Sequence, residues 1–177
     1  MFIFLGQVIY TLKTFSYVNS MIIDENKFKS LADSIVENIR ENKEFLNSKP
    51  IVLGILNGGK TLADYISKEL SLRKEYVSIK TRNGKSGNRG IMGIGKCVNI
   101  QFPSYLYSDN NVFLIVDDLI ESGLTMNIAK NIFSNSKTAV LIIKNPDGEK
   151  MFPDYYGEIM QNEWIDFFWE INNEDDD

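Results

Sequence analysis

The side chains best suited to chemistry lie in the string FLIVDDLIESGLTM, residues 113–126. Two adjacent acids, Asp117 and Asp118, follow an apolar run of strand length. In an open parallel sheet, ligands bind at the carboxyl ends of strands, so we expect both acids at a strand tip. The start of the following helix offers backbone N–H groups and hydroxyls to a phosphate, from Glu121, Ser122, Gly123, Leu124 and Thr125. Acids for sugar hydroxyls and Mg²⁺ beside a phosphate site predict sugar-phosphate binding.

The composition excludes several other kinds of chemistry. The chain of 177 residues contains no histidine and one cysteine, Cys97. Catalysis by Ser-His-Asp or Cys-His groups is therefore excluded, as are HExxH metalloenzymes, zinc fingers and cysteine-rich iron sites. Disulfides within the chain are excluded too, so nothing indicates an oxidising compartment. The chemistry must depend on carboxylates, lysines, hydroxyls, backbone groups and hard metal ions.

Charge is unevenly distributed along the chain. The net charge is -5 at pH 7, and most of it belongs to the acidic tail at residues 172–177. By contrast, the basic residues between Lys80 and Lys96 meet no acid. A local basic stretch in a nearly neutral chain indicates a small anionic ligand, because nucleic-acid binding needs a broad basic face. We expect no nucleic-acid partner.

No segment of the chain is predicted to cross a membrane. Residues 1–20 begin with apolar residues, but their longest apolar run is short, and no window approaches the roughly 18 apolar residues that a span requires. We expect a cytoplasmic protein with no membrane partner. Residues 1–20 are either an added N-terminal arm of unknown role or the product of an upstream start codon.

Apolar spacing predicts the first strands and helices. Residues 21–24 favour a short strand, and Asp24 is placed to cap a helix that begins at Glu25. A polar stretch follows at residues 42–49, and the continuous apolar run at residues 51–56 predicts a buried strand. The helix should bury the apolar residues that recur at helical intervals, which are Phe28, Leu31, Ala32, Ile35, Val36 and Ile39.

The alternation of strands and helices continues to residue 143. Residues 76–80 favour a strand, and the glycine-rich residues 81–95 favour a long mobile loop. Further strands are expected near residues 98–102, at 112–116 and at 138–143. Two helices should bury Leu62, Ala63, Ile66 and Leu70 in one case and Ile128, Ala129, Ile132 and Phe133 in the other. This order predicts one α/β domain with a parallel sheet.

Residues 113–126 resemble the signature with which type I phosphoribosyltransferases bind phosphoribosyl pyrophosphate (PRPP). The signature has four apolar residues, two acids, two apolar residues, an acid, Ser or Thr, Gly, any residue and Thr. Two acids alone would simply mark a strand-end turn, but a match of this length is specific. The resemblance implies a type I phosphoribosyltransferase-like fold with a parallel central sheet flanked by helices. It implies one domain at residues 21–171, with a core at 21–143 and a small C-terminal base-binding hood at 144–171.

The segment GILNGGKTLADYISKEL, residues 54–70, is similar to the family's pyrophosphate loop. The resemblance implies that Asn57, Gly58 and Gly59 contact PRPP, although the glycine pair alone would equally suit a plain turn. Asn57 stands where the family often has Arg or Lys, and Lys60 is a candidate for that charge.

The basic stretch supplies candidates for a loop that closes over the pyrophosphate. Such closure would stabilise the leaving anion and exclude water. The simpler alternative is a solvated loop, and the stretch lacks the Ser-Tyr pair familiar in related enzymes. The candidates are Arg82, Lys85 and Arg89.

The C-terminal part is similar to the hood of 6-oxopurine phosphoribosyltransferases, most closely the short xanthine-guanine type. Lys144 follows a predicted strand, and the string WIDFFWE begins twenty residues later at Trp164. The resemblance implies that Lys144 donates to the purine 6-oxo group, that Trp164 stacks on the ring and that the Ile165 backbone meets its exocyclic edge. Without this resemblance, we would predict that Trp164 and Trp169 pack in the core and that Lys144 is a solvated residue at a strand end. Phe168 replaces the usual proline.

The same resemblance implies catalytic roles for the acids. Glu121 takes the place of an aspartate that handles the proton near purine N7, as a general acid or base with one more methylene. Asp117 and Asp118 would bind the ribose 2- and 3-hydroxyls. Asp118 and Glu170 would contact Mg²⁺, the expected cofactor.

The resemblance implies a purine-salvage enzyme that transfers the phosphoribosyl group from PRPP to xanthine, guanine or hypoxanthine and releases pyrophosphate. It also implies a homodimer or homotetramer. The alternative is a protein of the same fold that binds PRPP or a nucleotide as a sensor, which Asn57, Glu121 and the unusual loop favour. The hood and Lys144 favour the enzyme. Transfer to a non-purine base is a third hypothesis.

Overall fold

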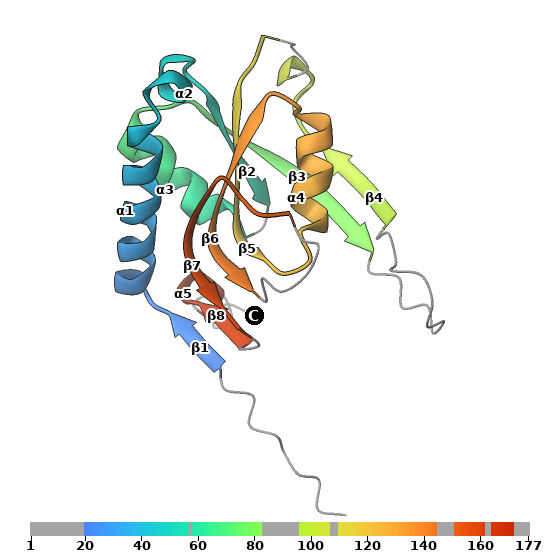
Figure 1. The fold of residues 1–177 in the computed structure, drawn as a ribbon. Coiled ribbons are helices and arrows are strands. Elements are labelled where there is room, and N and C mark those ends of the chain that lie inside the picture. Colours follow the sequence, from blue (N-terminus) through green and yellow to red (C-terminus); the bar gives the residue numbers. More distant parts are fainter. Residues whose placement is uncertain are drawn as a thin grey trace, which may run out of the picture.

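A six-stranded sheet forms the centre of the computed structural model, which describes residues 20–56, 58–82, 96–106, 110–144, 151–161 and 164–171 (Figure 1). Its strands are β2 Ile51–Leu56, β3 Lys74–Arg82, β4 Lys96–Gln101, β5 Phe113–Ile120, β6 Ser136–Lys144 and β7 Tyr155–Met160. They lie in the order β4-β3-β2-β5-β6-β7, and all neighbours are parallel except β3 and β4. The predicted α/β fold with a mostly parallel sheet is confirmed.

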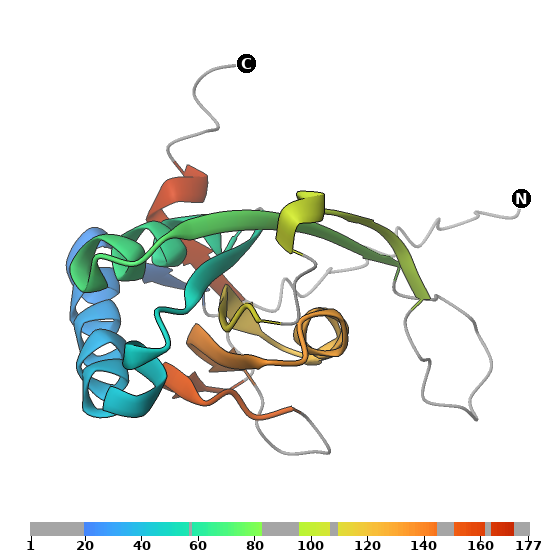
Figure 2. The same ribbon diagram turned by 90° about the horizontal axis from the view of Figure 1, so that it is seen from above.

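Helices cover both faces of this sheet (Figures 1 and 2). Helices α1 (Glu25–Glu41) and α3 (Lys60–Leu70) pack on one face, and α4 (Leu124–Ile132) packs on the other. The six residues predicted to face the core from α1 are buried. Asp24 caps α1 by accepting a hydrogen bond from the Lys27 N–H group at 2.7 Å. Apolar packing on both faces holds the carboxyl ends of β5 and β6 in place.

Several elements differ from the sequence-based expectation. A short helix, α2 (Lys43–Asn47), occupies the stretch expected to be merely polar, because Asn42 accepts a hydrogen bond from the Phe45 N–H group and Phe45 is buried. Strand β3 begins before and ends after the predicted residues 76–80, since it pairs with β2 from Lys74 onward and with the antiparallel β4 as far as Arg82. A 3-10 turn at Ser104–Leu106 follows β4. Among the described residues, no helix is long and apolar enough to span a membrane.

A second, two-stranded sheet joins the two ends of the described chain. Strand β1 (Ser20–Ile23) pairs in parallel with β8 (Trp164–Phe167), and the short helix α5 (Phe168–Ile171) follows β8. The segment expected to form the hood therefore includes β8 and α5 and is completed by a strand from the start of the domain. Strand β7, from the same segment, instead extends the main sheet. The exact domain boundaries remain a prediction.

Candidate functional site

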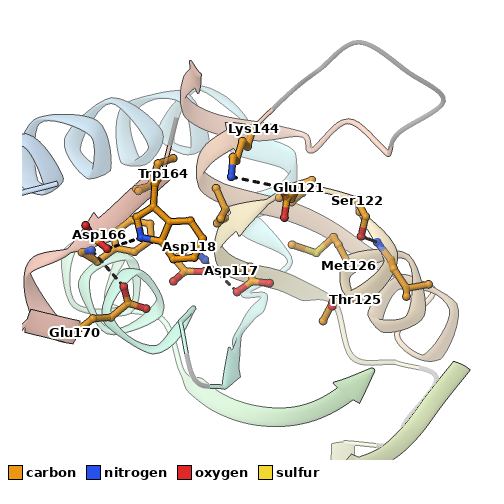
Figure 3. Close-up of a pocket in the computed structure, with 16 residues that line it drawn as sticks. Asp117, Asp118, Glu121, Ser122, Thr125, Met126, Lys144, Trp164, Asp166 and Glu170 are labelled. Carbon is orange, nitrogen blue, oxygen red and sulfur yellow. Dashed lines mark hydrogen bonds and ion pairs between the residues drawn. The ribbon is translucent and has the colours of Figure 1, made fainter. Parts of the chain in front are cut away.

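A cavity of about 430 Å³ opens at the carboxyl ends of β5 and β6, between the start of α4 and the β8–α5 segment (Figure 3). Its volume is typical of a site for a small molecule. Its lining comes from three separate segments of the chain: residues 117–126, Lys144, and the segment from Trp164 to Glu170. The fold thus brings the predicted sugar-phosphate residues and the predicted base-binding residues to one cavity.

Strand β5 does not end at the two aspartates, as the sequence predicted, but continues to Ile120. It pairs with β2 only as far as Val116, whereas β6 runs beside it to the end. The sheet therefore lacks a neighbour on one side of β5 where Asp117 and Asp118 lie. The expectation of a strand tip was wrong: the two acids lie within β5, just after its pairing with β2 stops and while its pairing with β6 continues.

The surroundings of the two aspartates disfavour their charged forms. Burial, and then the charge of Asp118, raises the pKa of Asp117 well above its ordinary value. Burial also raises the pKa of Asp118, and the Glu170 carboxylate adds to the rise. The Asp118 N–H group donates to Asp117 Oδ1 at 3.1 Å and opposes these effects only in part. A bound cation or hydroxyl donors would stabilise the ionised forms, so the pair is suited to such ligands.

The glycine pair after β2 packs directly against the aspartates. A Cβ atom at Gly58 would lie 2.0 Å from Asp118 Oδ2, and one at Gly59 would lie 2.4 Å from the Val116 carbonyl oxygen. A side chain at Gly58 would displace the Asp118 carboxylate, and one at Gly59 would meet backbone. Close approach therefore requires glycine here, and the predicted pyrophosphate loop lies beside the predicted ribose acids.

The start of α4 presents backbone amides to the cavity. Gly123 precedes the helix with a φ of 72°, a left-handed conformation that favours glycine. It supplies no side-chain cap, and Ser122 Oγ accepts from the Leu124 N–H group at 3.4 Å. Thr125 also lines the cavity. Amides at a helix start carry partial positive charge, so this geometry fits the predicted phosphate site.

The base end of the cavity is built around Lys144, at the end of β6. Its Nζ lies 3.3 Å from Glu121 Oε1 and 5.9 Å from the centre of the Trp164 ring (Figure 3). Trp164 is 59% exposed and is not a core residue, whereas Trp169 packs inside and stacks on Phe167 at 4.5 Å. The ammonium can donate a hydrogen bond to a flat heterocycle and the carboxylate can accept one from it. The exposed indole can stack on the same ring.

Ile165 and Glu170 occupy the wall of the cavity opposite α4. The Ile165 side chain is buried, its backbone pairs with Met21 and the residue lines the cavity, while the predicted contact of its main chain with a base stays a prediction. Glu170 Oε2 accepts a hydrogen bond from the Phe167 N–H group at 3.3 Å, which holds the carboxylate at the start of α5. Its charge acts on Asp118, the other acid predicted to contact Mg²⁺.

Asp166 is a cavity residue that the sequence analysis did not single out. Its Oδ1 accepts a hydrogen bond from Trp164 Nε1 at 2.7 Å. Its distance of two residues from Trp164 could have indicated this position, because residues two apart in a strand point to the same face. It was missed because the resemblance carries no role for this position.

Several predicted site residues lie outside the described residues. Arg82 ends β3, but its side chain is not described, and the same holds for the side chain of Cys97. The predicted roles of Asn57, Lys85 and Arg89 stay predictions, and the acidic tail, for which no role was predicted, also lies outside the described residues.

Magnesium fits the donors of this cavity in one particular way. The described residues include no group of three or more His, Cys, Asp or Glu side chains that could hold a metal ion. Mg²⁺ is usually bound through one or two carboxylates, water and substrate phosphates, so it needs no such group. Asp118, whose raised pKa a nearby cation would lower, and Glu170, whose charge acts on Asp118, supply donors of this kind.

Comparison with known proteins identifies the family. Residues 19–175 match the family described as "Phosphoribosyl transferase domain". The chain belongs to the phosphoribosyltransferase family. This phosphoribosyltransferase-family chain is 31% identical over 122 residues to a xanthine-guanine phosphoribosyltransferase of Cereibacter sphaeroides, covering 68% of each chain. It is 30% identical to the enzyme of the same name from Gluconobacter oxydans, with 67% of each chain covered.

Solved structures share the fold of this phosphoribosyltransferase-family protein. A purine phosphoribosyltransferase from Pyrococcus horikoshii superposes with a TM-score of 0.66 at 23% identity, covering 85% of this chain and 94% of the other. A Helicobacter pylori xanthine-guanine-hypoxanthine phosphoribosyltransferase gives 0.61 at 16% identity, with 90% and 97% covered. A Neisseria gonorrhoeae protein with bound ppGpp gives 0.64 at 16% identity, with 86% and 89% covered.

Proposed function

We propose that this protein transfers the 5-phosphoribosyl group from PRPP to a 6-oxopurine base and releases pyrophosphate. The observation that carries the proposal is the single cavity in which the acids and amides of residues 117–125 face Lys144 and Trp164. A sugar-phosphate site alone would suit many ligands. The exposed indole beside an ammonium adds a place for a flat base in the same cavity.

At the sugar-phosphate end, each group has a separate task. The amides from Gly123 to Thr125 bind the 5-phosphate at the start of α4. Asp117 and Asp118 accept hydrogen bonds from the ribose hydroxyls. The turn at Gly58 and Gly59, pressed against Asp118, places its backbone next to the pyrophosphate. Mg²⁺, when bound through Asp118 and Glu170 together with substrate oxygens, would neutralise charge on the leaving pyrophosphate.

At the base end, the protein holds the acceptor and manages its proton. Trp164 stacks on the purine ring, and Lys144 donates to the 6-oxo group. Glu121, at 3.3 Å from Lys144, accepts the proton at purine N7 as the other nitrogen of the five-membered ring attacks ribose C1. Departure of pyrophosphate leaves positive character at C1, which the carboxylates beneath the ribose stabilise.

The test is the release of pyrophosphate when the protein is mixed with PRPP and Mg²⁺. Guanine, xanthine, hypoxanthine, adenine, uracil and orotate are supplied separately. Release with at least one oxopurine supports the proposal and names the substrate. Release only with adenine, uracil or orotate would contradict the choice of base while retaining the reaction class.

The second candidate is a PRPP- or nucleotide-binding regulator of the same fold. Asn57 and Glu121, which depart from the family pattern, favour it. If none of the six bases causes release of pyrophosphate but calorimetry shows PRPP binding, the protein is such a regulator and not the enzyme. We also propose a homodimer or homotetramer, and light scattering on the purified protein would show a monomer if this is wrong.

A further inference from the structure

We propose that Asp166 orients the stacking indole of Trp164 and, through its charge, makes the site prefer neutral oxopurines to xanthine. This inference rests on the proposed function, because it assigns the base specificity of the same cavity. No role for Asp166 follows from the signature or from the hood pattern. It follows from the contacts of one side chain on β8.

The two faces of β8 have opposite surroundings. Ile165 and Phe167 point into the core and are 8% and 2% exposed. Trp164 and Asp166 share the other face, which lines the cavity. Strand β1 holds this face in place, since Ile22 pairs with Asp166 in the parallel ladder. Asp166 therefore acts from a strand that is anchored by backbone pairing and by its buried face.

An indole that is 59% exposed is not fixed by packing alone. The Trp164 ring has one N–H donor, and this donor is bonded to Asp166 Oδ1 at 2.7 Å. A hydrogen bond from a neutral donor to a carboxylate is stronger than one between neutral groups, so it restricts rotation of the ring. The ring thereby keeps its position 5.9 Å from Lys144 Nζ, the group placed to donate to the base.

The charge of Asp166 also acts on whatever stacks on Trp164. The cavity lining contains five acids, Asp117, Asp118, Glu121, Asp166 and Glu170, and among the lining residues Lys144 is the cation. Xanthine loses a ring proton near neutral pH, whereas guanine and hypoxanthine stay neutral there. A base anion next to Asp166 meets like charge, which disfavours xanthine relative to the neutral bases.

Two substitutions separate orientation from charge. Asp166→Ala removes both the acceptor and the charge, and Asp166→Asn keeps an oxygen acceptor while removing the charge. Glu41→Gln, at the far end of α1, is the matched control for loss of an exposed acid. We expect Asp166→Ala to raise the KM for guanine about tenfold, the worth of one hydrogen bond to a charged group, with the KM for PRPP unchanged.

In Asp166→Asn, which keeps an oxygen acceptor, the KM for guanine should stay close to the wild-type value. This substitution should also raise the ratio of kcat/KM for xanthine to that for guanine about threefold or more at neutral pH. A guanine KM unchanged in Asp166→Ala, or KM values for guanine and PRPP that rise together, would overturn the positioning role. A ratio unchanged in Asp166→Asn would overturn the role in specificity.

A measurement on Trp164 itself keeps the inference testable apart from catalysis. The chain has two tryptophans, so in a Trp169→Phe background the emission comes from Trp164. Time-resolved anisotropy should show faster local motion of the indole in Asp166→Ala than in Asp166→Asn. Equal motion would overturn the orientation role even if transfer is observed. Slower motion in Asp166→Asn with no transfer to any base would leave the contact intact and refute the proposed function instead.

Discussion

Asp118 lies where its own charge is disfavoured, because burial raises its pKa. Asp118→Asn replaces the carboxylate with a neutral amide of the same size. We expect the variant to lose Mg²⁺-dependent PRPP binding and, at neutral pH, to gain about 2 to 4 °C in the unfolding midpoint of the free protein, the shift for roughly 1 kcal/mol. Calorimetric titration and differential scanning calorimetry measure the two effects.

The exposed acid Glu41 provides the control for Asp118, since Glu41→Gln should change neither quantity. Full PRPP affinity in Asp118→Asn would refute the assignment of this carboxylate to the site. A lower midpoint would show that the charge of Asp118 stabilises the fold, which contradicts the effect of its burial.

The two tryptophans of the β8–α5 segment provide a matched pair of substitutions. Trp164 is exposed to the cavity, so Trp164→Ala should raise the KM for the base about 10- to 100-fold, the range for stacking on one aromatic ring, with little change in the KM for PRPP or in stability. Trp169 is partly buried and stacks on Phe167 against the core, so Trp169→Ala should instead lower stability by about 3 kcal/mol or more. Steady-state kinetics and urea unfolding separate these results. Equal effects of Trp164→Ala on both KM values would count against stacking.

Single residues of the site differ in how far the sequence identifies them. The acids and amides of residues 117–125 are contiguous, so one string predicts their common position. The contact of Gly58 with Asp118 joins two strands that are distant in sequence, and the glycine pair alone equally suits a turn. Asp166 acts through a hydrogen bond with the ring of Trp164, and a contact between two side chains cannot be deduced from composition.

At the scale of elements, the sequence predicts strands and helices well where their buried residues form an uninterrupted apolar pattern. Strands β2, β5 and β6 are fully apolar over most of their length, and α1 has an uninterrupted buried stripe. The end of β5 was placed too early because polarity at Asp117 suggests a turn, whereas the backbone continues as long as β6 runs beside it. Strand β7 was not predicted, since only Tyr155 and Met160 at its ends are buried.

A carboxylate just before the edge strand β7 adds to the backbone pairing of β7 with β6. Asp154 Oδ2 accepts hydrogen bonds from the N–H and Oγ1 groups of Thr138, both at 2.9 Å, and Lys137 pairs with the same carboxylate at 3.2 Å. Burial opposes ionisation, but these bonds and the Lys137 charge lower the pKa of Asp154 overall. We expect Asp154→Ala to destabilise the protein by about 1 to 3 kcal/mol at neutral pH, as measured by urea unfolding.

The effect of Asp154 has a defined dependence on pH. Because its pKa is lower in the folded state, its contribution is present above the ordinary carboxyl pKa and is lost as pH falls through the folded value. The difference between wild type and Asp154→Ala should therefore shrink in acid. A difference that stays constant from neutral to strongly acidic pH would show that apolar packing, rather than the ionised carboxylate, holds β7.

At the scale of the whole molecule, the two ends of the domain meet at the site. Strand β1 pairs with β8, so the face that carries Trp164 and Asp166 depends on residues at the start of the chain. Nothing local in either segment predicts this pairing, because it joins residues at opposite ends of the domain. The family resemblance predicts the hood at the C-terminus, and the structure adds the N-terminal strand that supports it.

Charge at the centre of the cavity links ligand binding to pH. The pKa values of Asp117 and Asp118 are raised in the free protein, so their contribution to its stability is present below the ordinary carboxyl pKa and is lost as pH rises through the raised values. In the proposed site, Mg²⁺ and the ribose hydroxyls would bind the ionised forms. The stabilisation by Mg²⁺ and PRPP should therefore grow with pH across this range, with uptake of ligand coupled to release of protons.

Thermal unfolding with and without Mg²⁺ and PRPP, from about pH 5 to about pH 8, measures this coupling. The ligand-induced rise in the unfolding midpoint should increase with pH in the wild type and should be small and nearly independent of pH in Asp118→Asn. The phosphate groups of PRPP also titrate in solution, so Glu41→Gln serves as the control that keeps both aspartates and must reproduce the wild-type curve. A flat wild-type curve would mean that the aspartates are already ionised in the free protein, and that ligand binding draws no free energy from relieving their burial.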